Sequence, residues 1–151
     1  NGLSVESLLD SIGKSFNIEA SDQPVKPAAK GEYGMYLPGQ WYKLVIHPEF
    51  MASGDSVHSL DVSMLHHNLI GPLLNITDPR RDERIDFVGG IRGLEELEKR
   101  VDSGDMAVAF SLYPTGLDEL MAVADAGKVM PPKSTWFEPK LADGLVSYVL
   151  D

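Results

Sequence analysis

The sequence predicts a single domain, residues 1–151, of the α+β (mixed α/β) class. Its expected parts are an N-terminal meander or hairpin, two strand–helix units and a C-terminal hairpin. The chain has 151 residues, a length that suits one hydrophobic core. Hydrophobic residues make up 43% of it, enough to fill that core. Apolar residues recur at helical spacing in some segments and alternate with polar residues in others.

The first part of the chain favours a helix and then β structure. Ser4 is a suitable N-cap, and apolar residues follow it at helical spacing. Aromatic and β-branched residues on both sides of Pro38-Gly39 are typical of a hairpin. The elements expected here are a helix after Ser4, a strand at 16–20, an exposed loop at 21–31 and hairpin strands at 33–37 and 40–46.

The second part favours alternating strands and helices. Asp61 begins a helix that Pro72 is expected to bend or end. The two strand–helix units are strand 85–88 with helix 94–104, and strand 106–112 with helix 115–127, the latter capped by Thr115 and Asp118. In the last helix Leu117, Leu120, Met121 and Ala124 are expected to face inward. Segments 134–137 and 145–150 are expected to form the C-terminal hairpin.

Charge and cysteine content exclude several classes of function. The net charge of -10 disfavours nucleic acid as a partner and basic docking to a membrane surface. No apolar run approaches the roughly 20 residues of a membrane span. The absence of cysteine excludes disulfides, thiolate catalysis and thiolate metal sites, and it agrees with a cytoplasmic location.

The segment 128–137 is the most unusual part of this acidic chain, because it carries lysines and no acidic residue. Lys133, Ser134 and Thr135 follow two prolines that stiffen the backbone. An ammonium group, two hydroxyls and backbone N–H groups suit a phosphate or carboxylate. The alternative is a rigid loop that enters an edge strand, with Lys133 solvated. The glycines of a Walker loop are missing.

A glycine-containing turn at 89–93 is a second candidate anion site. Gly89 and Gly90 follow an expected strand and precede an expected helix, and Arg92 supplies a positive charge. Glu95 and Glu96 favour a purely structural turn, since they already place negative charge at the helix start.

His66 is a candidate base or ligand contact, because it lies toward the apolar stripe of the middle helix. The alternative is a hydrogen-bonded structural histidine. On a helix, His66 and His67 point about 100° apart, which disfavours a shared metal ion. We therefore predict no metal site. No acid–base pair or serine nucleophile elbow is visible, so catalytic residues are unknown.

Three stretches carry a resemblance to a known family: Asp61-Val62-Ser63-Met64-Leu65-His66-His67, residues 84–90 and residues 124–140, the last of which includes Lys140. Together they resemble the C-terminal part of the prokaryotic family catalogued as domain of unknown function 1015. The resemblance covers most of the chain from about Glu32 onward.

The resemblance implies a larger protein. Members of that family carry, in their N-terminal half, an Asp-Gly-His-His-Arg motif that is similar to those of ParB- and sulfiredoxin-like nucleotide-binding domains, a group that includes free-serine kinases. This chain lacks the motif. The missing N-terminal half is therefore an expected partner, and any kinase-like activity, with ATP and magnesium as cofactors of the full-length protein, is expected to need it.

Two functions remain open. The first is an accessory or binding domain of a larger cytoplasmic protein that helps to bind a nucleotide or phosphorylated metabolite. The residues expected to contribute are Lys133, Ser134, Thr135, Lys140, Gly89, Gly90, Arg92 and His66. The alternative is a packing or dimerisation module, possible as a homodimer, for which an exposed Tyr33, Tyr36 and Trp41 region is the expected surface.

Overall fold

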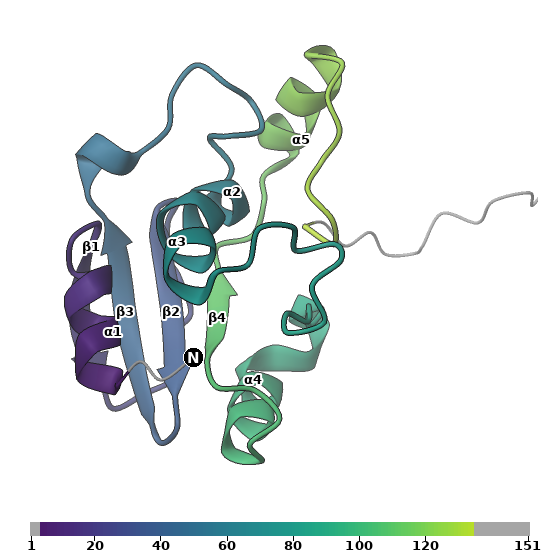
Figure 1. The fold of residues 1–151 in the computed structure, drawn as a ribbon. Helices are drawn as coiled ribbons and strands as arrows, with labels where there is room; N and C mark the ends of the chain where they lie inside the picture. Colours follow the sequence, from purple (N-terminus) through teal and green to yellow (C-terminus); the bar gives the residue numbers. More distant parts are fainter. Residues whose placement is uncertain (1–3, 135–151) are drawn as a thin grey trace, which may run out of the picture.

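The computed structural model describes residues 4–134 of the chain. It shows an antiparallel four-stranded sheet with helices packed on it (Figure 1). The strands are β1 (Phe16–Ser21), β2 (Glu32–Leu37), β3 (Gln40–Ile46) and β4 (Ala109–Leu112). The helices are α1 (Val5–Ile12), α2 (Asp61–Leu65), α3 (Gly71–Leu74), α4 (Gly93–Asp102) and α5 (Leu117–Asp125). The predicted α+β class is confirmed.

The sheet is built on the predicted hairpin. Its strand order is β1-β3-β2-β4, and every neighbouring pair is antiparallel. The hairpin closes with Leu37 opposite Gln40, around Pro38 and Gly39. Gly39 has a φ of 76°, a conformation that glycine adopts without steric cost. The hairpin and the predicted strand at 16–20 are therefore confirmed.

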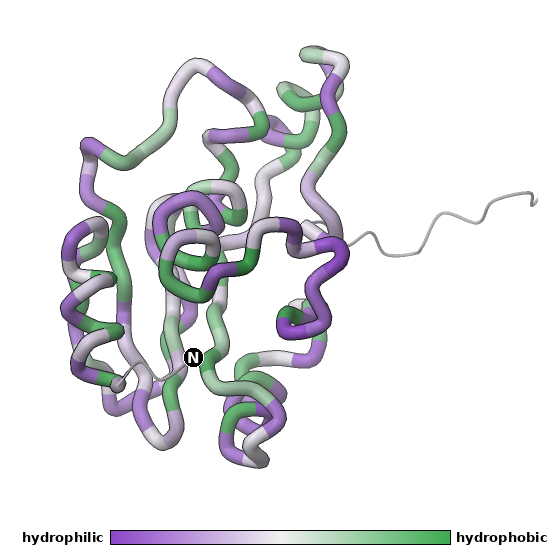
Figure 2. Tube along the Cα trace, in the orientation of Figure 1, coloured by the Kyte–Doolittle hydropathy of each residue, from purple (hydrophilic) through white to green (hydrophobic). Residues whose placement is uncertain are grey.

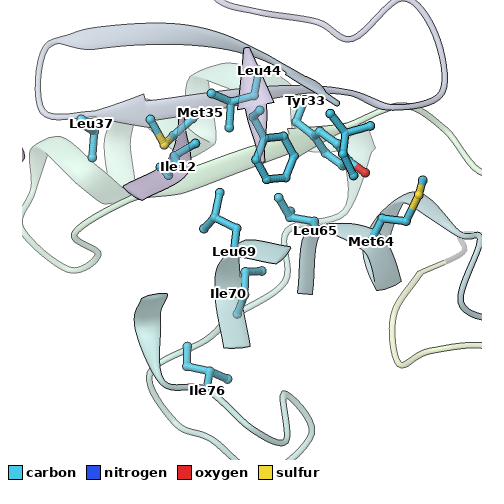
Figure 3. Close-up of a cluster of buried hydrophobic side chains, with 12 residues drawn as sticks. Ile12, Tyr33, Met35, Leu37, Leu44, Met64, Leu65, Leu69, Ile70 and Ile76 are labelled. Atoms are coloured by element: carbon cyan, nitrogen blue, oxygen red, sulfur yellow. The ribbon is translucent and has the colours of Figure 1, made fainter. Parts of the chain in front are cut away.

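One face of the sheet carries the main hydrophobic core. Figure 3 shows Leu65 and Leu69 of the middle helix pointing toward Tyr33 and Leu44 of the strands. Alternation along the strands puts every second side chain on this face, which is why apolar residues repeat there. The buried members of the core are Ile12, Phe16, Tyr33, Met35, Leu37, Leu44, Ile46, Met64, Leu65, Leu69, Ile70 and Ile76.

A second apolar cluster holds α4 against the sheet. Its buried members are Val25, Tyr36, Trp41 and Val101. The Tyr36 hydroxyl donates to the carboxylate of Asp102 over 3.0 Å, and the Trp41 indole N–H donates to Glu98 over 2.7 Å. Each aromatic ring is thus buried while its polar atom has a partner.

One expectation about exposure is wrong for this region. Tyr33, Tyr36 and Trp41, expected to be exposed, are all buried, because both faces of the sheet at β2 and β3 are covered. Most residues of the loop 21–31 are exposed, whereas Val25 is buried in the second cluster. Its carbonyl accepts a 2.7 Å hydrogen bond from the Ser111 hydroxyl, which ties the loop to β4.

The segment 85–88 is not a strand, so only one of the two predicted strand–helix units forms. Side-chain hydrogen bonds hold the preceding turn as a loop: Arg84 donates to the carbonyls of Leu74 and Asn75 over 3.3 and 2.8 Å. Figure 2 shows this connection between α3 and the 3-10 turn at Gly90–Arg92 as mostly hydrophilic. The segment 85–88 itself is mostly apolar, and Ile85 packs against the main core without pairing with a strand.

The remaining unit, β4 with α5, differs from the prediction in detail. β4 begins at Ala109 and not at Met106, whose N–H donates to the Arg100 carbonyl at the end of α4. The N-cap of α5 is Gly116, whose N–H donates to the Glu119 carboxylate over 3.0 Å, in place of a cap by Thr115 and Asp118.

The inward face of α5 is only partly the predicted one. Leu120 is half-buried, but Leu117, Met121 and Ala124 are exposed, and the buried residue is Val123. The predicted C-terminal hairpin lies outside the described residues. Within the described part of the chain, no helix is long and apolar enough to cross a membrane.

Gly34 of β2 is expected to be the glycine least tolerant of substitution. A Cβ atom there would lie 2.2 Å from the Ser111 hydroxyl oxygen and 2.6 Å from the Val25 carbonyl oxygen. Gly34→Ala should therefore lower the free energy of unfolding by about 2–3 kcal/mol, measured by urea denaturation. Gly90→Ala is the matched control, since a Cβ there meets nothing within 4 Å. Equal stability of the two variants would show that this close packing is absent.

Candidate functional site

The middle helix runs from Asp61 to Leu74 through a π-helical turn at His66–Ile70. Pro72 accounts for the wide turn, because it has no N–H and its ring crowds the carbonyl four residues earlier. The Gly71 N–H donates to the His66 carbonyl, five residues back. Pro72 was expected to bend or end this helix nearby. The helix widens before Pro72 and ends after Leu74, where Asn75 is left-handed with a φ of 54°.

A surface groove lies between this helix and the segment before Ser134. One part, of about 220 Å³, is lined by Val57, His58, Val62, Ser63, His66, His67, Pro79, Pro131 and Pro132. An adjoining part, of about 550 Å³, is lined by Val57, Thr77, Asp78, Pro79, Arg80, Val129, Met130, Pro131 and Pro132. The two parts share Val57 and three proline residues, so they form one depression, which we name the proline–histidine groove.

Three imidazole rings gather along the groove. The ring centroids of His58 and His67 are 5.3 Å apart, and those of His66 and His67 are 6.3 Å apart. The two adjacent histidines, expected to diverge on a helix, thus line the same depression. Among the described residues, no group of three or more His, Asp or Glu side chains is arranged to hold a metal ion.

Asp55 fastens one wall of the groove to the other. Its carboxylate accepts hydrogen bonds from the backbone N–H groups of Val57 and His58 over 2.9 and 3.0 Å, and it forms an ion pair with Lys128. The Lys128 ammonium, helped by these backbone donors, holds the pKa of Asp55 well below its usual range. The carboxylate is therefore charged at neutral pH and keeps Lys128, which precedes the lining residues Val129 and Met130, in place.

His66 is the least solvated ring of the three. It is partly buried, and burial together with the neighbouring His67 lowers the pKa of its imidazole below the ordinary value. At neutral pH the ring is therefore uncharged. A neutral imidazole offers one N–H donor, one nitrogen acceptor and a flat ring surface.

The lysine-containing loop adjoins the groove. Lys133 follows the lining residue Pro132 and has a left-handed φ of 52°. Its ammonium lies 5.7 Å from the centroid of the Phe87 ring, a cation–π distance. The Ser134 hydroxyl donates to the Pro131 carbonyl over 2.7 Å, which fixes the loop. Thr135 and Lys140 lie outside the described residues.

The structure does not bring the glycine turn into this site. Gly89 is extended, and Gly90–Arg92 forms a 3-10 turn before α4, so no strand leads into the helix here. The Arg92 guanidinium lies 4.0 Å from the Glu96 carboxylate on its own helix. None of Gly89, Gly90 and Arg92 lines the groove.

Sequence reasoning missed several groove residues. His58, His67 and Arg80 line it, and Asp55 positions its walls. The density of histidine between residues 58 and 67 and the pair Pro131-Pro132 were the available signals. Nothing in the local sequence showed that these two distant segments face each other.

Residues 1–63 match a family model described as protein of unknown function (DUF1015). This match supports a resemblance to that family over the matched residues. This is the family whose resemblance was noted from the sequence, although the match covers less than half of the chain and begins at the first helix. That the chain is the C-terminal part of the family's protein stays a prediction. No curated protein and no solved structure matches this chain.

The titration of His66 tests the description of the groove. Its pKa should lie below 6.5, because burial disfavours the charged ring. The measurement is a pH titration of the imidazole C–H signals by NMR. His67→Ala should raise the pKa of His66 by removing a neighbouring positive charge, yet leave it below 6.5, since burial remains. A pKa at or above 6.5 in the unchanged protein would contradict the partly buried placement of this ring.

Proposed function

We propose that this chain is an accessory binding domain of a larger cytoplasmic protein. Its ligand would be a nucleotide or another phosphorylated metabolite with a planar ring, held in the proline–histidine groove. The observation that carries the proposal is the gathering of three imidazoles and three proline rings in one depression, whose lining residue Pro132 directly precedes Lys133.

The groove walls suit a planar ring. Imidazole rings present flat faces, and the puckered proline rings add apolar surface. Binding sites for small molecules are commonly apolar with a few placed polar groups. The His66 ring, neutral at pH 7, adds one donor and one acceptor for a ring edge. A heterocyclic base would therefore meet stacking surfaces and a hydrogen-bonding group.

The rim of the groove suits an anion. The chain has a net charge of -10, yet Arg80 and Lys133 lie at or beside the groove. Arg80 is paired with Asp78 over 3.2 Å, which reduces its attraction for a ligand. Among residues 4–134, Lys133 makes no direct ion pair; its ammonium lies over the Phe87 ring and helps to lower the pKa of Asp86, and it is the leading candidate for a phosphate. Ser134 serves the loop geometry instead, because its hydroxyl already donates to Pro131.

The alternative function, a packing or dimerisation module, is favoured by a different surface from the one expected. Leu117, Met121 and Val129 are exposed apolar residues on and after α5. Light scattering of the purified chain measures its mass in solution and so distinguishes the binding domain from the packing module. A dimer that dissociates when Met121 is replaced by Ser favours the packing module.

Ligand binding is tested by thermal unfolding with and without ATP and magnesium. A ligand at 100 times its dissociation constant should stabilise the folded state by about 2.7 kcal/mol. Lys133→Ala and His66→Ala should each reduce or abolish the shift, because they remove the phosphate contact and one wall of the ring site.

Lys14→Ala is the matched control, since Lys14 is an exposed lysine after α1 and outside the groove. It should leave the shift unchanged. ADP and inorganic phosphate, tested in parallel, separate recognition of the base from recognition of the phosphate. No shift with any of the three ligands would refute the proposal, and so would a shift that Lys14→Ala weakens as much as Lys133→Ala does.

A further inference from the structure

The segment 113–134, which contains α5 and one wall of the groove, stands apart from the hydrophobic core. Neither apolar cluster of the described residues includes any residue of this segment. Within it, Val123 has the only fully buried side chain. Figure 1 shows α5 beyond the end of β4, away from the middle of the sheet. Apolar burial, which fixes most helices in a domain, therefore contributes less to holding α5 than to holding the other helices.

Hydrogen bonds inside this segment make it one unit. The Thr115 hydroxyl donates to the Ser134 carbonyl over 3.3 Å, so the two ends of the segment meet. The Lys128 N–H donates to the Val123 carbonyl over 3.0 Å, which ties the residues after α5 back to the helix. We therefore expect α5 and the groove residues 129–132 to move together.

Charged side chains make the bonds between this segment and the rest of the described chain. Lys30, in the loop before β2, pairs with Glu119 of α5 over 2.5 Å, and Asp55 pairs with Lys128. No backbone–backbone hydrogen bond joins residues 113–134 to residues 4–112. The two ion pairs therefore carry most of the polar attachment of the segment.

Salt weakens contacts of this kind. The four paired side chains are between 21% and 43% exposed, so water reaches both ion pairs. The Debye length falls from about 30 Å at about 0.01 M salt to about 3 Å at about 1 M. A third contact, between the Lys133 ammonium and the Phe87 ring, is electrostatic as well. The apolar contacts that hold the other helices lack this sensitivity.

We propose that residues 113–134 form a flap over the proline–histidine groove and that the two ion pairs are its latch. When the latch is broken, the flap moves away and takes with it the groove wall formed by residues 129–132. The hinge is at Tyr113 and Pro114, which are exposed and lie between β4 and α5. Control of ligand entry by the flap rests on the proposed function, whereas the movement itself does not.

The movement is measured as the distance between two spin labels in the full chain, without any ligand. The chain has no cysteine, so labels attach only to introduced ones. Ala126→Cys labels the flap and Asp10→Cys labels α1, and both positions are exposed. At about 0.01 M salt the distances should form one narrow distribution. At about 1 M salt the distribution should broaden and its mean should shift, because screening weakens the latch.

The matched control pairs Asp10→Cys with Lys99→Cys, an exposed position on α4. The second apolar cluster holds α4 against the sheet. The distances of this control pair should therefore be the same at both salt concentrations.

Removal of the latch charges should reproduce the effect of salt. Asp55→Asn and Glu119→Gln together abolish both ion pairs, and each new side chain keeps an oxygen that accepts the backbone hydrogen bonds of the original carboxylate. At about 0.01 M salt this double variant should already show the broad distribution of flap distances, and added salt should change it little.

Two results would overturn the proposal: flap distances that stay narrow and unchanged at high salt, and equal broadening of the flap pair and the control pair. The salt titration leaves the latch residues unaltered, so it decides the question even where the double variant fails to fold. Both measurements are made without ligand. The absence of a thermal shift with ATP would therefore refute the proposed function and leave the flap standing, whereas unchanged flap distances would refute the flap alone.

Discussion

The placement of the middle helix on the sheet depends on one buried carboxylate. Asp61, at the first position of α2, accepts hydrogen bonds from the Gly31 N–H over 2.9 Å and from the Tyr33 hydroxyl over 3.2 Å. Burial raises the pKa of Asp61, and burial together with the Asp61 charge raises that of Tyr33. The distance between two such buried polar groups is tightly constrained. If they moved apart, each would have lost its hydration without gaining a hydrogen bond in return.

The groove follows from this attachment. Tyr33 fixes where the helix starts, and the apolar contacts of Leu65 and Leu69 fix which side of it faces the sheet. The opposite side then carries His66 and His67 outward, and the π turn that Pro72 requires keeps both rings in one depression. Residues 128–132 form the opposite wall of the groove, and the ion pair between Lys128 and Asp55 holds this wall in place.

Sequence reasoning was most successful where the pattern is local. The hairpin around Pro38-Gly39 and the helix after Asp61 depend on turn chemistry and periodicity, which a short segment shows by itself. It failed where contacts between distant segments determine the structure. Arg84 donates to two carbonyls and holds residues 85–88 out of the sheet. In α5 the buried residue is Val123 and not Leu117. The candidate site was predicted only in part. The sequence pointed to His66 and Lys133, but it did not show the contacts that bring their two segments together.

The most direct test of this account compares Asp61→Asn with Asp61→Ala by urea denaturation and by hydrogen exchange of the Gly31 amide. Asn keeps a side-chain oxygen that accepts from Gly31, so its amide should stay protected. Ala leaves that donor unpaired, which should cost about 1–3 kcal/mol of unfolding free energy and expose the amide. Equal stability of the two variants, with a protected Gly31 amide in both, would contradict the claim that this carboxylate positions the helix and its groove.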